Sequence, residues 1–314
     1  INHEGHLGIQ KTKTRVKCLY WWPGLDKDIE RLVRDCSTCN DSDKSRVLFK
    51  PPLQPVSTPD MPWDKVGIDI CGPIEDGEKS TYIIVIVDHF SKWPEVEFVD
   101  QIKAETVVQC LDKICIREGI PKTIVSDNGP QFVSDVFKAY VVRNGITHTR
   151  TSNYHPAGNG AVERFNRVVK GTIQLANKAR KNWRKEVQKM LWGFRITPCL
   201  STGQSPFVLM RGRTPLTKDS VGWMESARKI DWSPAEVRKR IDKAKEIYKK
   251  QYDDKNACKP VNLRVGEFVK VKLPGMRRKG ESKFSDVLEV EKIFCNSARL
   301  SDGKVWHLGR LTKC

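Results

Sequence analysis

The sequence predicts a multidomain protein, with a central α/β region between a small helical unit and a small β-barrel. Its 314 residues give room for two or three domains. With 39% hydrophobic residues the chain can bury a core, which argues against wholesale disorder. The net charge of +18 is typical of proteins that bind a polyanion, and nucleic acid fits better than a membrane surface. No apolar run approaches the ~18 residues that a membrane span needs.

The first unit spans residues 1–45. A segment with helical periodicity, "DKDIERLVRDC", is followed by Cys36 and Cys39, which have the C-x₂-C spacing of a zinc knuckle. A unit of ~45 residues is small to stand without a metal or a disulfide. Two ordinary buried thiols are the alternative. The other eight cysteines are scattered singly, which indicates a reducing intracellular compartment.

A linker rich in proline, at 46–62, leads into the α/β region at 63–215. Strands are predicted by the patterns "KVGIDICG", "YIIVIVDHF" and "KTIVSDNG", and helices by "AETVVQCLDKICIREG", "SDVFKAYVVRNG" and "AVERFNRVVKGTIQLANKA". The region closes with "SPFVLMRGRTP".

A helical linker at 216–260 and a small β-barrel at 261–314 complete the chain. The linker helix opens at Ser233, Pro234 and Glu236, a capping box with proline at the first helical position. Short alternating strands with glycine turns follow and predict the barrel. From residue 226 onward there are 23 Lys and Arg against 12 Asp and Glu, an excess of 11 positive charges.

Three acids stand out by their positions. Asp69 lies inside a strand flanked by apolar residues, Asp127 comes where a strand meets a turn, and Glu163 opens the long helix. Converging from separate elements, they would form an oxygen cage for two Mg²⁺ or Mn²⁺ ions, which suits phosphoryl transfer. Each also has a plainer reading: Asp127 could cap its turn, and Glu163 could serve the helix dipole. Asp69 has the weakest alternative, because strand interiors disfavour Asp.

Basic residues follow Glu163 along one face of the long helix. Arg167 and Lys170 share its stripe, which suits a phosphate backbone, although pairing of exposed charges is the alternative. The permissive loop before the helix includes Asn159 and Gly160, where we expect DNA to enter. A basic turn between barrel strands could hold phosphates or be a solvated charge run; its candidate residues are Arg277, Arg278 and Lys279.

Taken together, these motifs resemble retroviral and retrotransposon integrases of the gypsy type. The resemblance lies in "GIDICGP", "SDNGPQF" and "YHPAGNGAVERFNR", in the N-terminal "HEGHLGIQKTKTRV", "YWWPGLDKDI" and "CSTC", and in the C-terminal "GKVWHLGRL". It covers nearly the whole chain. It implies an RNase H-like core whose D,D(35)E triad maps onto Asp69, Asp127 and Glu163, and an SH3-like C-terminal barrel. It also implies a zinc-binding N-terminal domain, with His3 and His6 as the ligands that complete the set of Cys36 and Cys39.

The resemblance further implies a function: DNA integration, in which 3′-end processing of element DNA precedes strand transfer into target DNA. We expect two Mg²⁺ (or Mn²⁺) ions per active site, Zn²⁺, a homo-oligomer on DNA, a possible chromatin protein as partner, and a nuclear location. Because the chain does not begin with Met, we expect it to be part of a longer precursor. The alternatives are a domesticated DNA-binding relative without catalysis, a nuclease of the same fold, and a structural protein.

Overall fold

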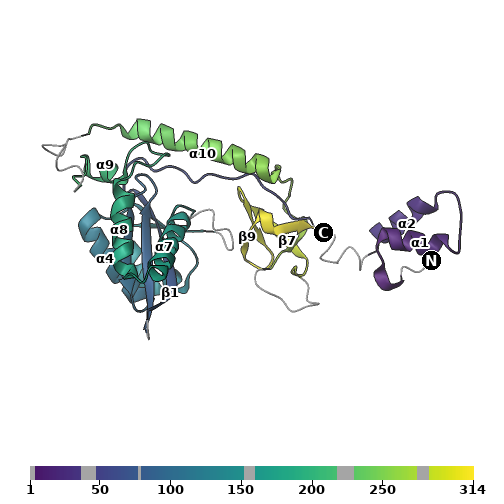
Figure 1. The fold of residues 1–314 in the computed structure, drawn as a ribbon. Coiled ribbons are helices and arrows are strands. Elements are labelled where there is room, and N and C mark those ends of the chain that lie inside the picture. The colour runs from purple at the N-terminus through teal and green to yellow at the C-terminus, as the bar shows by residue number, and fades with distance from the viewer. Residues whose placement is uncertain (1–3, 37–46, 77–78, 152–159, 218–229, 274–282) are drawn as a thin grey trace. The chain divides into compact units, whose positions relative to one another are not determined.

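The computed structural model describes residues 4–36, 47–76, 79–151, 160–217, 230–273 and 283–314 (Figure 1). The chain divides into two compact units, one of residues 52–257 and one that combines residues 1–51 with 258–314. Each is described by itself.

A mixed five-stranded sheet forms the centre of the larger unit, with strand order β3-β2-β1-β4-β5. Its strands are β1 (Lys65–Asp76), β2 (Lys79–Asp88), β3 (Pro94–Val99), β4 (Thr123–Ser126) and β5 (Thr147–Arg150). The first three strands pair antiparallel, whereas β4 pairs parallel with β1, and β5 parallel with β4. The apolar run predicted as a strand buried on both faces is confirmed, since residues 83–87 of β2 are at most 3% exposed.

Helices cover both faces of this sheet. One face packs against helices α4 (Ala104–Glu118), α5 (Pro130–Val133) and α6 (Asp135–Arg143) through one apolar cluster. A second cluster on the opposite face joins β1 and β2 to α7 (Gly160–Lys178) and α8 (Trp183–Ile196). The apolar residues that recur at helical spacing along α7 are all buried: Val162, Phe165, Val169, Ile173 and Ala176. Helix α8 has no counterpart among the helices predicted from the sequence.

A long helix, α10 (Pro234–Asn256), extends along the segment that leads into the core. The amide of Leu53 donates to Asp253, and the hydroxyl of Thr58 donates to Asp242, so this proline-rich segment runs antiparallel to the helix (Figure 1). Helix α9 (Pro206–Arg211) and α10 share a small apolar cluster with Phe90. The predicted proline at the first turn of α10 is confirmed, but the capping box is wrong, because the Ser233 side chain caps no backbone amide.

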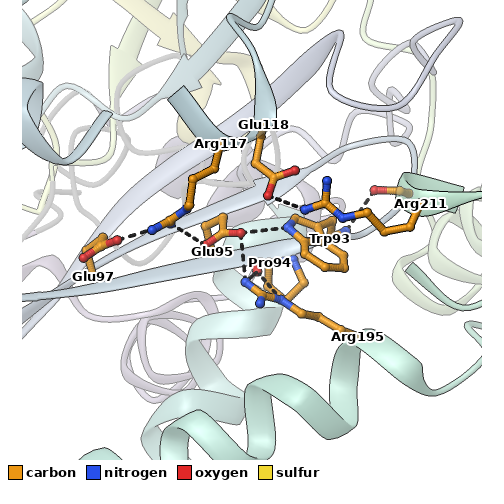
Figure 2. A network of polar contacts seen from close by, with 9 residues as sticks. Trp93, Pro94, Glu95, Glu97, Arg117, Glu118, Arg195 and Arg211 are labelled. Atoms are coloured by element: carbon orange, nitrogen blue, oxygen red, sulfur yellow. Dashed lines mark hydrogen bonds and ion pairs between the residues drawn. The ribbon is translucent and has the colours of Figure 1, made fainter. Parts of the chain in front are cut away.

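A network of ion pairs fastens β3 to three helices (Figure 2). We name it the Trp93 network; it consists of Trp93, Glu95, Glu97, Arg117, Glu118, Arg195 and Arg211. The nearly buried carboxylate of Glu95 accepts from Trp93 Nε1 at 2.8 Å and pairs with Arg195 at 2.9 Å and Arg117 at 3.1 Å. Arg195 and Arg211 lie over the Trp93 ring, 4.2 and 5.2 Å from its centre, and Arg211 pairs with Glu118 at 2.5 Å. Charges inside this network are therefore matched.

The smaller unit contains two separate cores. Helices α1 (Ile9–Lys17) and α2 (Leu25–Arg34) pack around Val16, Leu25 and Ile29. A five-stranded antiparallel sheet, with order β10-β6-β7-β8-β9, forms the C-terminal core. Its strands are β6 (Phe268–Val271), β7 (Leu288–Ile293), β8 (Ser297–Leu300), β9 (Val305–His307) and β10 (Leu311–Lys313). Among the described residues, no helix combines the length and apolarity that a membrane crossing requires.

Candidate functional site

Two of the three predicted acids lie on neighbouring strands at the same level. Strands β1 and β4 are parallel, with Val66 opposite Ile124 and Gly67 opposite Val125. Continuing this register by two residues sets Asp69 opposite Asp127, which directly follows β4. Adjacent strands lie about 4.8 Å apart, and side chains opposite each other in register share a face. The sheet thus brings these two carboxylates, 58 residues apart in sequence, to the same edge.

The third acid comes from the helix that covers this face. Glu163 lies in the first turn of α7, and α7 packs on β1 and β2 through the second apolar cluster. One turn further along, the buried Asn166 donates from Nδ2 to Asp69 Oδ2 at 2.7 Å. This hydrogen bond ties the first turns of α7 to the middle of β1. It places Glu163 on the same side of the sheet as Asp69.

The electrostatics of the acids show that they influence one another. Burial raises the pKa of Asp69, and the neighbouring charge of Asp127 adds to that increase. Burial likewise raises the pKa of Glu163, and the charge of Asp69 adds to it. The negative charges of the three residues therefore oppose one another, with Asp69 between the other two.

The donor chemistry of this cluster fits divalent cations. Carboxylate oxygens are the ligands that Mg²⁺ and Mn²⁺ prefer, and mutual repulsion between carboxylates favours a bound cation. The side chains do not form a closed cage as they stand. Within the described residues, no three His, Cys, Asp or Glu side chains lie close enough to hold one ion. One oxygen of Asp127 accepts from the Gly129 amide at 2.9 Å, the turn-capping contact given above as its alternative role.

Two regions of the chain match known protein families. Residues 59–156 match the family described as "Integrase core domain", and residues 2–45 match the "Integrase zinc binding domain". The chain belongs to the retroviral and retrotransposon integrase family.

Similar proteins are polyproteins of mobile elements and a worm protein. "Uncharacterized protein K02A2.6" of Caenorhabditis elegans is 37% identical over 62% of this chain and 15% of its own length. The "Retrovirus-related Pol polyprotein from transposon 412" of Drosophila melanogaster is 26% identical over 93% of this chain and 25% of its own length. "Transposon Tf2-3 polyprotein" of Schizosaccharomyces pombe is 26% identical over 67% and 16%. The chain therefore spans a quarter or less of these relatives.

A solved structure shares the fold along nearly the whole chain. It is described as a simian T-cell lymphotropic virus intasome in complex with PP2A regulatory subunit B56 gamma. The match covers 98% of this chain and 99% of that one, with a TM-score of 0.61 and 15% sequence identity. At this identity the likeness concerns the fold alone.

The predicted DNA-binding residues lie partly within the described residues. Arg167 and Lys170 are exposed on α7; the charge of Arg167 reaches Glu163, and that of Lys170 reaches Asp69. Gly160 is the first residue of α7. Asn159, Arg277, Arg278 and Lys279 lie outside the described residues.

Half of the predicted zinc set is likewise described. The ring nitrogen Nδ1 of His6 lies 3.5 Å from Cys36 Sγ, although 30 residues separate them in sequence. The backbone of His6, with a φ of 46°, helps to turn the chain toward that thiol after Gly5. His3 and Cys39 lie outside the described residues. The contact between His6 and Cys36 brings one nitrogen and one sulfur together, the donor types of structural zinc sites.

Asn166 is the residue that the sequence reading missed. It occupies the buried stripe of α7, four residues after Val162 and three before Val169, where an amide is out of place. Its Oδ1 is buried with no hydrogen-bond partner among the described residues. The sequence pattern that could have identified Asn166 is a polar residue inside an otherwise apolar stripe, one helical turn from a candidate acid.

Proposed function

We propose that this chain is a DNA integrase that processes the 3′ ends of element DNA and joins them to target DNA, with Asp69, Asp127 and Glu163 as its catalytic residues. The observation that carries this proposal is the register of β1 and β4, whose continuation brings Asp69 level with Asp127, together with the charge of Asp69 acting on Glu163. The mixed sheet would then be an RNase H-like core, and the C-terminal antiparallel sheet an SH3-like barrel. The domain limits given from the sequence belong to the same proposal.

Asp69, Asp127 and Glu163 would hold a pair of Mg²⁺ or Mn²⁺ ions. When bound, such a pair activates the attacking oxygen and stabilises the leaving oxygen of a phosphodiester. Asn166 acts on the protein side, because its hydrogen bond fixes the orientation of the Asp69 carboxylate. Arg167 and Lys170 would hold the donor backbone, and Asn159, Gly160 and the basic turn at 277–279 would add contacts to DNA.

The N-terminal unit would hold Zn²⁺ through His3, His6, Cys36 and Cys39. The contact between His6 and Cys36 supports this assignment. Binding would fold the unit rather than assist the chemistry. A chelator should therefore lower the helical content of an isolated 1–45 peptide, and zinc should restore it. The same treatment of a Cys36→Ala peptide is the control, and equal helicity with and without chelator in the parent peptide would remove the zinc site.

A strand-transfer assay with Mg²⁺ or Mn²⁺ tests the catalytic assignment. Wild type should give DNA products longer than the donor strand, and Asp69→Asn, Asp127→Asn and Glu163→Gln should give none while still binding DNA. Asp135→Asn, a change of a nearly fully exposed acid on α6, is the matched control and should keep activity. Equal product from wild type and Asp127→Asn would leave the domesticated, non-catalytic alternative. Cut products without any longer strand would favour the nuclease.

The oligomeric state, the location and the protein partner expected from the sequence belong to the same proposal. Integration requires two DNA ends and a target, so we propose a homo-oligomer that acts on DNA in the nucleus, with a chromatin protein as a further possible partner. The fold likeness to an intasome chain supports the assembly.

A further inference from the structure

The turn between β2 and β3 contains a buried acid whose two carboxylate oxygens both accept hydrogen bonds. Asp88 is fully buried, and its oxygens accept from the amides of Phe90 and Ser91, at 3.2 and 2.8 Å, and from the Ser91 hydroxyl at 2.6 Å. These bonds close the turn. Asp88 contributes one negative charge beside the cations of this turn, and burial raises its pKa.

The next residue, His89, has an unused ring nitrogen in this environment. Its side chain is nearly buried, at 8% exposure, and Nε2 has no hydrogen-bond partner within the part of the chain that the structure describes. Its backbone amide donates to the Lys65 carbonyl at 2.9 Å, which fixes the turn beside the start of β1. Burial lowers the pKa of His89 to about 3, helped by the charges of Lys92, Lys65, Lys245 and Arg164. The ring is therefore neutral at physiological pH and can donate one hydrogen bond.

Four cations from four elements act on the charge of this ring. Lys65 begins β1, Lys92 lies in the turn, Arg164 is in the first turn of α7, and Lys245 comes from α10. The Lys92 ammonium donates to the His89 carbonyl at 2.6 Å, and Lys245 donates to the Val56 carbonyl at 2.6 Å and to the Thr58 hydroxyl. We call these four cations and His89 the turn cluster.

The charge of the turn cluster is not matched by acids. Burial lowers the pKa of Lys65, Lys92 and Lys245, the last to about 8. The charge of Arg164 lowers the pKa of Lys92 further, and the charges of Lys92 and Lys65 lower that of Lys245. The acids whose charges act in the opposite sense on these lysines are Asp88 and Asp242, and the thiol of Cys199 acts in the same sense on Lys92. Asp242 is shared, because it also accepts from Thr58 and lies 4.0 Å from Arg238. Three half-buried lysines and an exposed arginine, with fewer acids than cations acting on them, favour a bound anion.

We propose that the turn cluster is a phosphate-binding site. Ammonium groups, one guanidinium and a neutral imidazole N–H can together donate to several oxygens of one tetrahedral anion, which a single carboxylate cannot match. The inference rests on the proposed function for the source of the phosphate: Arg164 is the direct neighbour of Glu163, so a phosphodiester of the bound DNA strand lies within reach. A free phosphate ion shares the same chemistry.

Amine labelling read by mass spectrometry tests the site without requiring catalysis. On the full-length Asp127→Asn protein at pH 8, Lys245 should react faster than exposed lysines of ordinary pKa. Inorganic phosphate and a DNA duplex should each slow its labelling, whereas chloride at equal ionic strength should not. Protection by phosphate but not by duplex would assign the site to a free anion and end the DNA assignment. The absence of protection by either would overturn the site.

A charge-loss pair measures what the cluster contributes to DNA binding. Lys92→Gln/Lys245→Gln should lower the slope of log affinity against log salt by about one. The matched control, Lys103→Gln/Lys113→Gln, removes two exposed lysines of the α4 region. Lys92→Arg/Lys245→Arg should restore the slope if the loss is one of charge. Equal slopes for the Gln pair and its control, with thermal unfolding unchanged, would overturn the proposal even if strand transfer is active, so this failure is distinct from a failure of the proposed function.

Discussion

The Trp93 network and the three predicted catalytic acids lie in one compact unit, yet they treat buried charge in opposite ways. In the network each charge meets an opposite charge, so that Glu95 satisfies two arginines and an indole. Among the acids, Asp69 is acted on by two further carboxylates, and it accepts hydrogen bonds from the Asn166 side chain and the Ile70 backbone amide. Paired charges stabilise the fold, whereas a group of like charges favours the binding of a ligand of opposite charge.

The largest expected change in stability comes from removing one carboxylate of the Trp93 network. Glu95→Ala leaves Arg195, whose side chain is 18% exposed, without its carboxylate partner. Removing one partner of a buried pair typically costs about 3–5 kcal/mol. We expect the free energy of unfolding, measured by urea denaturation, to fall by about that amount.

Glu97→Ala is the matched control on the same strand. Glu97 pairs at 3.3 Å with Arg117, which is half exposed and also pairs with Glu95. An exposed pair of this kind is worth about 0–1 kcal/mol. Equal losses in the two variants would show that burial does not decide the value of these pairs.

The same contrast explains what the sequence could and could not predict. Asp69, Asp127 and Glu163 were predictable because each breaks a local pattern: an acid inside a strand, an acid at a strand end, and an acid opening a basic helix face. Most strands and helices followed from periodicity, including the end of α4 before Gly119, whose φ of 92° favours glycine.

The Trp93 network was not predictable in this way. Its members lie on four elements separated by up to 118 residues, and exposed Glu and Arg have the same sequence pattern as paired ones. The parallel pairing of β1 with β4 could not be predicted from the sequence either. The two strands are separated by β2, β3 and α4, and their register depends on how these elements pack. Leu32 shows the limit of periodicity itself: it shares the apolar face of the segment "DKDIERLVRDC" with Ile29 and Val33, yet it is 37% exposed.

A smaller change in stability is expected from neutralising Asp69, one of the three acids that repel one another. The pKa of Asp69 is raised in the folded protein, so its contribution to stability is fully present below its ordinary pKa and is lost as pH rises through the raised value. Asp69→Asn removes that loss. The variant should therefore gain stability relative to wild type as pH rises from about 4 toward neutral, measured as the midpoint of urea unfolding at each pH.

Two controls sharpen this result. The pKa of Asp135 is lowered by its hydrogen bond with Lys138, so Asp135→Asn should show the opposite trend and lose relative stability as pH rises. Addition of Mg²⁺ at neutral pH should stabilise the wild type and leave Asp69→Asn unchanged. If Asp69→Asn is less stable than wild type at every pH, the hydrogen bond with Asn166 outweighs charge repulsion, and the contrast between the two regions fails.

The smallest effect concerns the exposed cations beside the acids. Arg167→Gln should weaken DNA binding uniformly across sequences and reduce the slope of log affinity against log salt by about 0.9, since one phosphate contact is lost. Its stability should stay within about 0.5 kcal/mol of wild type, because the side chain is exposed. Lys178→Gln, at the far end of the same helix, is the matched control, because it removes the same charge well away from Glu163. An equal change of slope in both variants would mean that the net charge of the chain, rather than a contact beside the acids, governs DNA binding.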